Sequence, residues 1–279
     1  MTSPVGDPLA PPTAAQWDAA SARYGAYLDT PLGRLRDELA WRNARGSLPA
    51  RGDSAAPPLV LDAGCGPGHA TARLLGAGYR VHAVDPAPAM LDRARERVGR
   101  LAPTLGGRVV FAQGGLDDLP TLGGAARYDA ILCHNVLEFV ADPAAAIRAL
   151  AAALRPGGTL SLLTLNRWSE LLRATATGDQ AAIRAALDRR AVVETMTGGT
   201  RRLNDPDAIR GWLADAGLRV ASLHGVRLVA DASPGVGYEE LLATELAIAA
   251  QAPPAFAYVG RQIQFIARQA DTTPNSPPS

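Results

Sequence analysis

The sequence has no lysine, so all 28 of its basic residues are arginine. They stand against 27 acidic residues, which leaves a formal net charge of +1. A charge this close to neutral excludes a global electrostatic field that would draw the protein onto nucleic acid. Local arginine clusters could still bind a carboxylate or a phosphate, because a guanidinium group offers two parallel N–H donors.

Cysteine and histidine are scarce. Cys65 and Cys133 are the two cysteines, and the four histidines are scattered along the chain. Two thiols provide no disulfide framework and the histidine spacing fits no metal motif, so we expect no metal site. Long apolar runs are also missing, and the first residues, MTSPVGDPLAPPT, lack the basic and apolar segments of a signal peptide. These absences predict a cytoplasmic protein without membrane contact.

A glycine-rich stretch, LVLDAGCGPGHATARLL, begins at Leu59. Its apolar start predicts a buried strand that ends near Asp62, and HATARLL resumes with helical spacing. Between them, Gly64, Gly66 and Gly68 alternate with other residues, which is typical of a tight turn where a ligand approaches the backbone. The stretch therefore predicts the strand, loop and helix of a nucleotide-binding unit, with a turn that holds no ligand as the alternative.

The ligand of this loop is indicated by its acid. Dinucleotide enzymes favour G-x-G-x-x-G, which seats a pyrophosphate on the helix N-terminus. Here the pattern is Asp62-x-Gly64-x-Gly66-x-Gly68, and a carboxylate at Asp62 would repel a pyrophosphate. The same carboxylate suits a ligand with an ammonium group, such as S-adenosylmethionine (SAM). We therefore predict that Asp62, Gly64 and Gly66 contact this cofactor.

Further candidates follow the next strands. Asp85 ends the second predicted strand about 20 residues past the glycine loop, where an acid accepts the two ribose hydroxyls; an N-cap before Pro86 is the alternative. After the third strand, Asp117 is placed to meet the adenine amino group with Leu116 beside the ring, or forms an ordinary acidic turn. His134 ends the fourth strand, where it could contact the cofactor or the acceptor, serve as a base, or be structural.

Alternating strand and helix patterns over 279 residues, 47% of them hydrophobic, predict an α/β fold with a Rossmann-like sheet of seven strands. The predicted layout is a disordered N-terminus over 1–14, a helical cap over 15–54, a main domain over 55–268 and a disordered tail over 269–279. Within the main domain, residues 166–203 form an insertion after the fifth strand, helical at first, which we expect to act as a lid over the substrate.

Several finer boundaries are also predicted. In the helical cap, Leu35 and Leu39 lie on one apolar stripe. Arg34 and Arg36 lie off that stripe, and a solvent-exposed face is the alternative to a functional role for both. The fifth strand is expected over 159–165 after the Arg155–Gly158 turn. Irregular structure is expected over 191–203, a sixth strand with a break near His224 over 218–229, and a last strand over 257–267.

Seven such strands, the D-x-G-x-G-x-G loop and Asp85 together resemble the class I SAM-dependent methyltransferases, over about residues 55–268. The resemblance implies SAM as the cofactor. It also implies that the seventh strand is inserted antiparallel between the fifth and the sixth.

A narrower resemblance connects the chain to the bacterial tRNA 5-carboxymethoxyuridine methyltransferases, which esterify the carboxylate of a modified wobble uridine. It is carried, in order, by Tyr24-Gly25, Arg34-Leu35-Arg36, His134-x-Val136-Leu137-Glu138-Phe139-Val140-Ala141-Asp142-Pro143, Leu154-Arg155-Pro156-Gly157-Gly158, Asn166, Gly225-Val226-Arg227 and Gly260-Arg261-x-Ile263. The resemblance implies that Arg36 holds the SAM carboxylate. It also implies cofactor contacts at Gly64, Cys65, Asp85, Leu116, Asp117 and His134.

Two departures from that family concern its substrate and its loop. A lysine-rich segment of the family is represented here only by Thr200-Arg201-Arg202, and a run of three glycines is replaced by Gly64-Cys65-Gly66. Phosphate contacts dominate nucleic-acid affinity, so the first departure bears on whether the acceptor is tRNA.

The acceptor decides which residues are catalytic. Methyl transfer is an in-line displacement, so the protein has mainly to align the acceptor and exclude water. A carboxylate acceptor needs no base, and Arg227 near the end of the sixth strand is the candidate to orient it, with a surface ion pair as the alternative. A phenol or amine needs a base, for which His134 is the candidate.

Three functions follow: a SAM-dependent methyltransferase acting on tRNA, the same chemistry on a small metabolite, or a non-catalytic SAM-binding protein. A continuous arginine face through Arg167, Arg201, Arg202 and Arg227 would indicate RNA. A closed pocket too small for a nucleotide would indicate a metabolite. The oligomeric state is left open.

Overall fold

The computed structural model describes residues 10–50, 56–101, 108–123 and 127–270. Most of the predicted disordered N-terminus and tail lie outside these ranges. Within the former, Ala10 is placed and its carbonyl accepts a hydrogen bond from the backbone N–H of Thr200, at 3.2 Å. No helix in the described part of the chain is long and apolar enough to cross a membrane.

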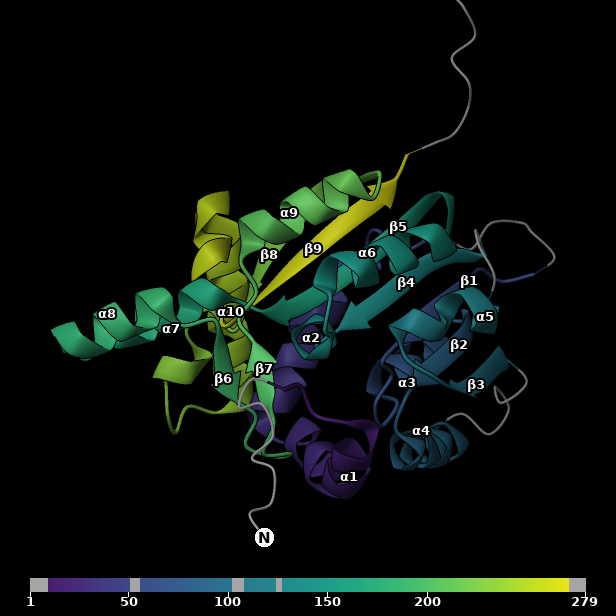
Figure 1. The fold of residues 1–279 in the computed structure, drawn as a ribbon, viewed down its shortest axis with the longest axis horizontal. Helices are drawn as coiled ribbons and strands as arrows, with labels where there is room; N and C mark the ends of the chain where they lie inside the picture. The colour runs from purple at the N-terminus through teal and green to yellow at the C-terminus, as the bar shows by residue number, and fades with distance from the viewer. Residues whose placement is uncertain (1–9, 51–55, 102–107, 124–126, 271–279) are drawn as a thin grey trace, which may run out of the picture.

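The core of the molecule is one seven-stranded sheet (Figure 1) in the order β3-β2-β1-β4-β5-β9-β8. Its strands are β1 (Leu59–Ala63), β2 (Arg80–Asp85), β3 (Val109–Gln113), β4 (Tyr128–His134), β5 (Leu154–Leu165), β8 (Leu218–Val226) and β9 (Gln262–Gln269). The strands from β3 to β5 pair in parallel, and β9 pairs antiparallel with both β5 and β8. The predicted fold class, including the antiparallel insertion, is confirmed.

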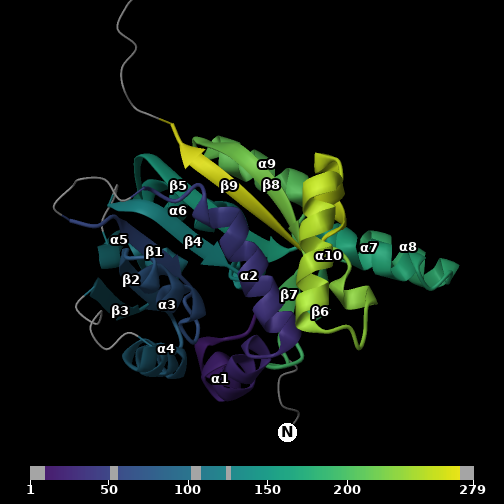
Figure 2. The same cartoon turned by 180° about the vertical axis from the view of Figure 1, so that it is seen from behind.

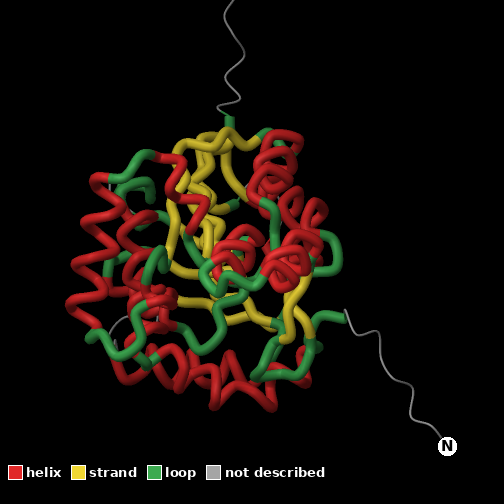
Figure 3. The backbone as a smooth tube through the Cα atoms, turned by 90° about the vertical axis from the view of Figure 1, so that its left-hand side faces the viewer, coloured by secondary structure: helices red, strands yellow, loops and turns green. Residues whose placement is uncertain are grey.

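Helices cover both faces of the sheet, which explains why its central strands are apolar on both sides. On one face lie α2 (Pro31–Arg45), α3 (His69–Gly76), α4 (Pro88–Leu101) and α10 (Tyr238–Gln251), as Figure 2 shows. On the other lie α5 (Leu119–Gly123), α6 (Pro143–Ala153) and α9 (Pro206–Asp215). Figure 3 shows the strands enclosed between these layers.

Both N-terminal helices begin at a side-chain cap. In α1 (Ala14–Leu28), the Thr13 hydroxyl accepts from the Gln16 N–H and the Gln16 side chain accepts from the Thr13 N–H, a capping box. In α2, Thr30 caps and Pro31 occupies the first turn. Leu35 and Leu39 are buried as expected, but Arg36 is only 6% exposed, so the solvated-face alternative for this residue is wrong.

The insertion contains more order than its sequence predicts. Helices α7 (Arg167–Thr175) and α8 (Gln180–Asp188) project from the body, as Figure 1 shows. The stretch 191–203, expected to be irregular, instead forms a hairpin of β6 (Ala191–Val193) and β7 (Thr200–Arg202). Strands of three residues carry too little periodicity to be recognised, and this hairpin depends on contacts with distant segments: Arg23 of α1 donates to the Met196 carbonyl.

Three strand limits also differ from expectation. Strand β5 starts at Leu154, because Tyr128 already pairs with Leu154 before the Pro-Gly-Gly turn forms an irregularity in the ladder. Strand β8 ends at Val226, and its irregularity lies between Val220 and Ser222 and not at His224. Strand β9 starts at Gln262, because the preceding proline-containing segment forms the 3-10 helix η5 (Pro254–Val259).

Candidate cofactor site

The glycine loop lies at the carboxyl ends of the parallel strands, between β1 and α3. The backbone N–H groups of Gly64 and Cys65 both donate to the Val84 carbonyl, at 2.8 and 2.9 Å, which ties the loop to β2. Gly64 has a φ of 71°, and a Cβ built there would lie 2.2 Å from Cγ2 of Val136. Only glycine fits both the left-handed backbone and this close approach.

Two cavities adjoin the loop. One has a volume of about 400 Å³ and extends toward α2 and α3; the other has about 280 Å³ and extends toward β2 and the 3-10 helix η2 (Leu116–Asp118). Both are lined by the same five residues, Tyr24, Gly64, Gly66, His134 and Asn135. These five, which we call the junction residues, mark where one extended ligand would pass from one cavity into the other.

The larger cavity is lined by a carboxylate and a guanidinium group from distant segments of the chain. Asp62 is 3% exposed and accepts a hydrogen bond from the Thr71 hydroxyl at 2.5 Å; burial raises the pKa of its carboxyl to about 6. Arg36 donates to the Asp37 carboxylate at 3.0 and 3.1 Å, and its guanidinium lies 5.5 Å from the centre of the Tyr27 ring. The cavity thus offers groups for both charges of a zwitterion.

The smaller cavity contains the other predicted acids. Asp85 is 7% exposed, and its carboxylate accepts from the Gly66 N–H at 2.8 Å and the Ala87 N–H at 2.9 Å. Burial raises the pKa of Asp85 to about 6. Leu116 is buried, Asp117 is exposed, and both line the cavity. A carboxylate, an apolar surface and a second acid therefore line one space.

His134 and Cys65 lie at the loop in states that limit their chemistry. His134 Nε2 is 2.8 Å from the Ser161 hydroxyl, and burial lowers the pKa of its imidazole to about 4, so the ring is neutral at pH 7. Burial raises the pKa of the Cys65 thiol well above its usual value. Such a thiol is unreactive, so Cys65 has no nucleophilic role.

Two junction residues were missed by sequence reasoning as site residues. Asn135 has a φ of 58° and follows His134 at the end of β4. Asparagine tolerates this left-handed conformation, so its place directly after a strand was the one sequence signal that could have indicated a site residue. Tyr24 lies on α1, and only the packing of that helix across the sheet edge brings it to the loop. Nothing in its local sequence predicts that position.

The predicted acceptor residue Arg227 does not line either cavity. It is 8% exposed, has a φ of 58°, donates to the Tyr27 hydroxyl at 3.0 Å and forms an ion pair with Asp231. The arginine of this ion pair is buried, whereas its partner Asp231 is exposed to solvent. The continuous arginine face that would indicate RNA is not formed either, since Arg167 is paired with Asp205 at 3.1 Å and its side chain is 15% exposed.

Comparison with known proteins agrees with this geometry. A family model described as a methyltransferase domain matches residues 61–160. The ubiquinone biosynthesis O-methyltransferase of Xanthomonas campestris is 31% identical over 213 residues, which cover 75% of this chain and 78% of that protein. The chain belongs to the class I SAM-dependent methyltransferases.

Two further similarities extend over most of the chain. The tRNA 5-carboxymethoxyuridine methyltransferase of Escherichia coli is 29% identical over 254 residues, covering 86% of this chain and 90% of that protein. A SAM-dependent methyltransferase structure from Mesorhizobium loti superposes with a TM-score of 0.57 at 20% identity, covering 84% of this chain and 99% of that one. The second similarity concerns the fold alone.

SAM is the cofactor of this methyltransferase, and the residues present fit it. A Cβ at Gly64 would fill the space beside Val136, and both cavities open at this glycine. The groups that line the two cavities include an arginine, two buried carboxylates and an apolar surface. Together they match the zwitterionic end, the ribose and the purine of SAM. In the described part of the chain, no group of three or more His, Cys, Asp or Glu side chains is arranged to hold a metal ion.

Proposed function

We propose that SAM lies across both cavities, with its ribose on Asp85 and its adenine beside Leu116 and Asp117. The larger cavity then takes the methionine end, with the ammonium group at Asp62 and the carboxylate at Arg36. This arrangement is supported by burial: the ammonium and the carboxylate of the cofactor would each meet an oppositely charged side chain that is itself shielded from water. The junction residues, His134 among them, surround the sulfonium.

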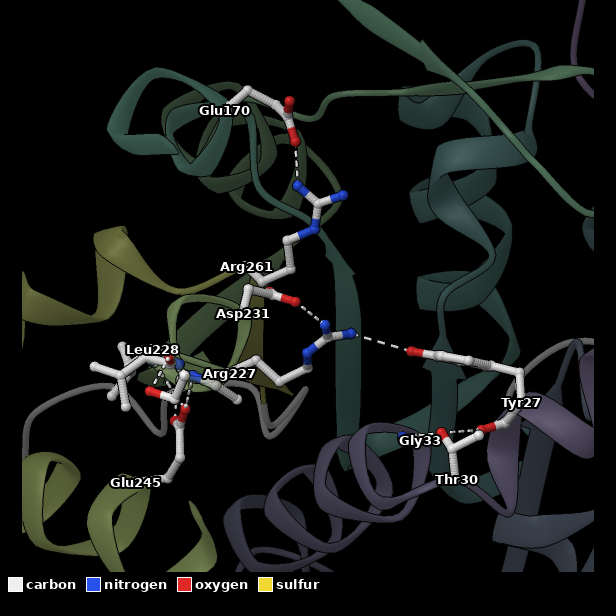
Figure 4. Close-up of polar contacts among 12 residues, drawn as sticks. Tyr27, Thr30, Gly33, Glu170, Arg227, Leu228, Asp231, Glu245 and Arg261 are labelled. Atoms are coloured by element: carbon white, nitrogen blue, oxygen red, sulfur yellow. Dashed lines mark hydrogen bonds and ion pairs between the residues drawn. The ribbon is translucent and has the colours of Figure 1, made fainter. Parts of the chain in front are cut away.

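We propose further that the acceptor group is a carboxylate. The support is a set of three buried or half-buried arginines, Arg227, Arg261 and Arg201, which lie outside both cavities. The backbone N–H of Arg261 donates to the Arg227 carbonyl at 3.0 Å. The Arg261 side chain pairs with Glu170, and the Arg227 side chain donates to the Tyr27 hydroxyl (Figure 4). The Tyr27 ring lies against the Arg36 guanidinium. The Nε atoms of Arg227 and Arg201 are buried without a hydrogen-bond partner in the described chain. An anionic acceptor would supply the missing acceptors.

The state of His134 supports the same acceptor. When bound, SAM supplies a methyl group on an already activated sulfonium. The chain then has to hold the acceptor in line and exclude water. A carboxylate is ionised at neutral pH and needs no base, whereas a phenol or ammonium must lose a proton. An imidazole whose pKa is about 4 accepts that proton poorly, so the site favours the acceptor that needs no base.

The larger molecule that we propose as acceptor is a tRNA whose wobble uridine carries the carboxylate. The support is the similarity to the tRNA 5-carboxymethoxyuridine methyltransferase of E. coli, which covers 90% of that protein. A carboxylated small metabolite is the second candidate. It is favoured by the pairing of Arg167 and Arg227 with acids of this chain, which leaves fewer arginines for phosphate contacts.

The test is transfer of a tritiated methyl group from SAM into total tRNA, in parallel with a small-molecule extract. A methyl ester releases its label as volatile methanol in mild alkali, whereas an ether or an N-methyl group keeps it. The proposal expects alkali-labile label in tRNA, lost after nuclease digestion and filtration. Alkali-stable label in either fraction contradicts a carboxylate acceptor, and labile label confined to the extract contradicts tRNA. Asp85→Asn serves as the low-activity control.

A further inference from the structure

A buried carboxyl group that the proposed chemistry does not use lies just beyond the junction. Glu138 belongs to the 3-10 helix η3 (Leu137–Phe139) after β4 and is 2% exposed. Its Oε2 accepts from the Thr164 hydroxyl at 2.7 Å, and its Oε1 accepts from the Asn135 amide Nδ2 at 3.3 Å. Glu138 thus connects the end of β5 to a residue that lines both cavities.

The direction of these hydrogen bonds is fixed by their partners. The Asn204 amide donates to Thr164 Oγ1 at 2.8 Å, which directs the Thr164 hydroxyl hydrogen toward Glu138. Burial raises the pKa of Glu138; in its carboxylate form the side chain only accepts, so the Asn135 group that faces it is then the NH₂ and not the oxygen. The backbone of Asn135 is held as well, because its N–H donates to the Leu163 carbonyl at 2.7 Å.

The hydrogen bond to Glu138 leaves the carbonyl oxygen of the Asn135 amide for other contacts. The oxygen Oδ1 of Asn135 accepts no hydrogen bond from the residues that the structure describes. It is also not one of the buried polar atoms that lack a partner, so it is accessible. The residue itself lines both cavities. With Nδ2 held by Glu138, the amide oxygen is the end of the Asn135 side chain that is left to contact a ligand.

We propose that Glu138 is a positioning residue that fixes the Asn135 amide with its oxygen toward the junction, where it favours the sulfonium of SAM over the neutral thioether of S-adenosylhomocysteine. A dipole oriented in a water-poor site discriminates between a cation and a neutral group of the same shape. The enzyme would thereby bind its substrate cofactor more tightly than its product. This inference rests on the cofactor and not on the identity of the acceptor.

Calorimetric binding of SAM and S-adenosylhomocysteine tests the inference in three variants. Asn135→Gly removes the amide and is compatible with the φ of 58°. Glu138→Gln places an NH₂ group opposite Asn135 and reverses the preferred amide orientation. Tyr128→Phe is the matched control, since it removes an equally buried 2.5 Å hydrogen bond to His82 at the opposite end of β4.

We expect Asn135→Gly and Glu138→Gln each to weaken SAM binding about fivefold to tenfold, the effect of one hydrogen bond, and to change S-adenosylhomocysteine binding less than twofold. Tyr128→Phe should lower the unfolding temperature and leave the ratio of the two affinities unchanged. Equal weakening of both ligands, or a changed ratio in Tyr128→Phe, overturns the inference. A normal ratio in Glu138→Gln overturns the positioning role. If Glu138→Gln is too unstable, Thr164→Val, which frees the carboxylate from its other anchor, replaces it.

Discussion

Replacement of Asp85 by asparagine should separate the stability of this methyltransferase from its affinity for SAM. The carboxylate is 7% exposed and accepts two backbone N–H groups, yet its pKa is raised from 3.8 to about 6 by burial. That shift corresponds to about 3 kcal/mol by which the ionised group destabilises the ligand-free fold at neutral pH. The destabilisation is complete above pH 6 and disappears as the pH falls toward 3.8, because the native state binds the proton more tightly than the unfolded state.

Asparagine is nearly isosteric and carries no charge, so it removes this destabilisation. Its amide oxygen accepts from one of the two N–H groups, and the other bond is lost at about 1–2 kcal/mol. At pH 7.5 the ligand-free Asp85→Asn protein should therefore be as stable as the parent or about 1–2 kcal/mol more stable. Affinity for SAM should fall about tenfold or more, since each hydrogen bond to a charged acceptor is worth about 1.5–3 kcal/mol.

The measurement combines SAM titration calorimetry with unfolding at pH 5.5 and 7.5. The stability gain of the variant should be larger at pH 7.5 than at pH 5.5, where part of the parent Asp85 is already protonated. Parent affinity for SAM should also fall below about pH 6, with a weaker pH dependence in the variant. Unchanged SAM affinity would refute the ribose assignment. A fall of several degrees in unfolding temperature would show that Asp85 acts chiefly as a cap for the following helix.

Three other substitutions test the remaining parts of the site. Arg36→Ala should weaken SAM binding about tenfold or more, since it removes a buried charge-assisted contact; an unchanged dissociation constant would exclude it from the site. Arg227→Ala should lower turnover and leave SAM affinity unchanged, because the residue lines neither cavity; normal turnover would reduce it to a structural ion pair. Gly64→Ala should destabilise the fold by about 1–3 kcal/mol in denaturant unfolding, because its Cβ meets Val136 and its φ is 71°. Gly76→Ala, in α3 with nothing near its added Cβ, is the control, and an equal effect there would contradict the steric argument.

The sequence was informative where the structure depends on neighbours along the chain. The glycine loop and the acids at or near the ends of β1 and β2 are local patterns, and each is found where it was predicted. The α/β class followed from the alternation of strands and helices, and the antiparallel insertion of the last strand followed from the resemblance to the methyltransferase family. By contrast, the β6–β7 hairpin and the start of β5 were missed, because both depend on pairing with residues far away in the sequence.

The sequence by itself therefore determined the fold, the cofactor and the end of the sheet at which the candidate cofactor site lies, since spacing in the sequence fixes which residues follow each strand. Only the tertiary structure decided the surroundings of that site. It buries Arg36, brings Tyr24 to the junction, joins Asn135 to Glu138 by a hydrogen bond, and ties Arg227 to Tyr27 and Asp231. These contacts join segments that are up to 200 residues apart. Their energies depend on burial and on partners that no local pattern contains.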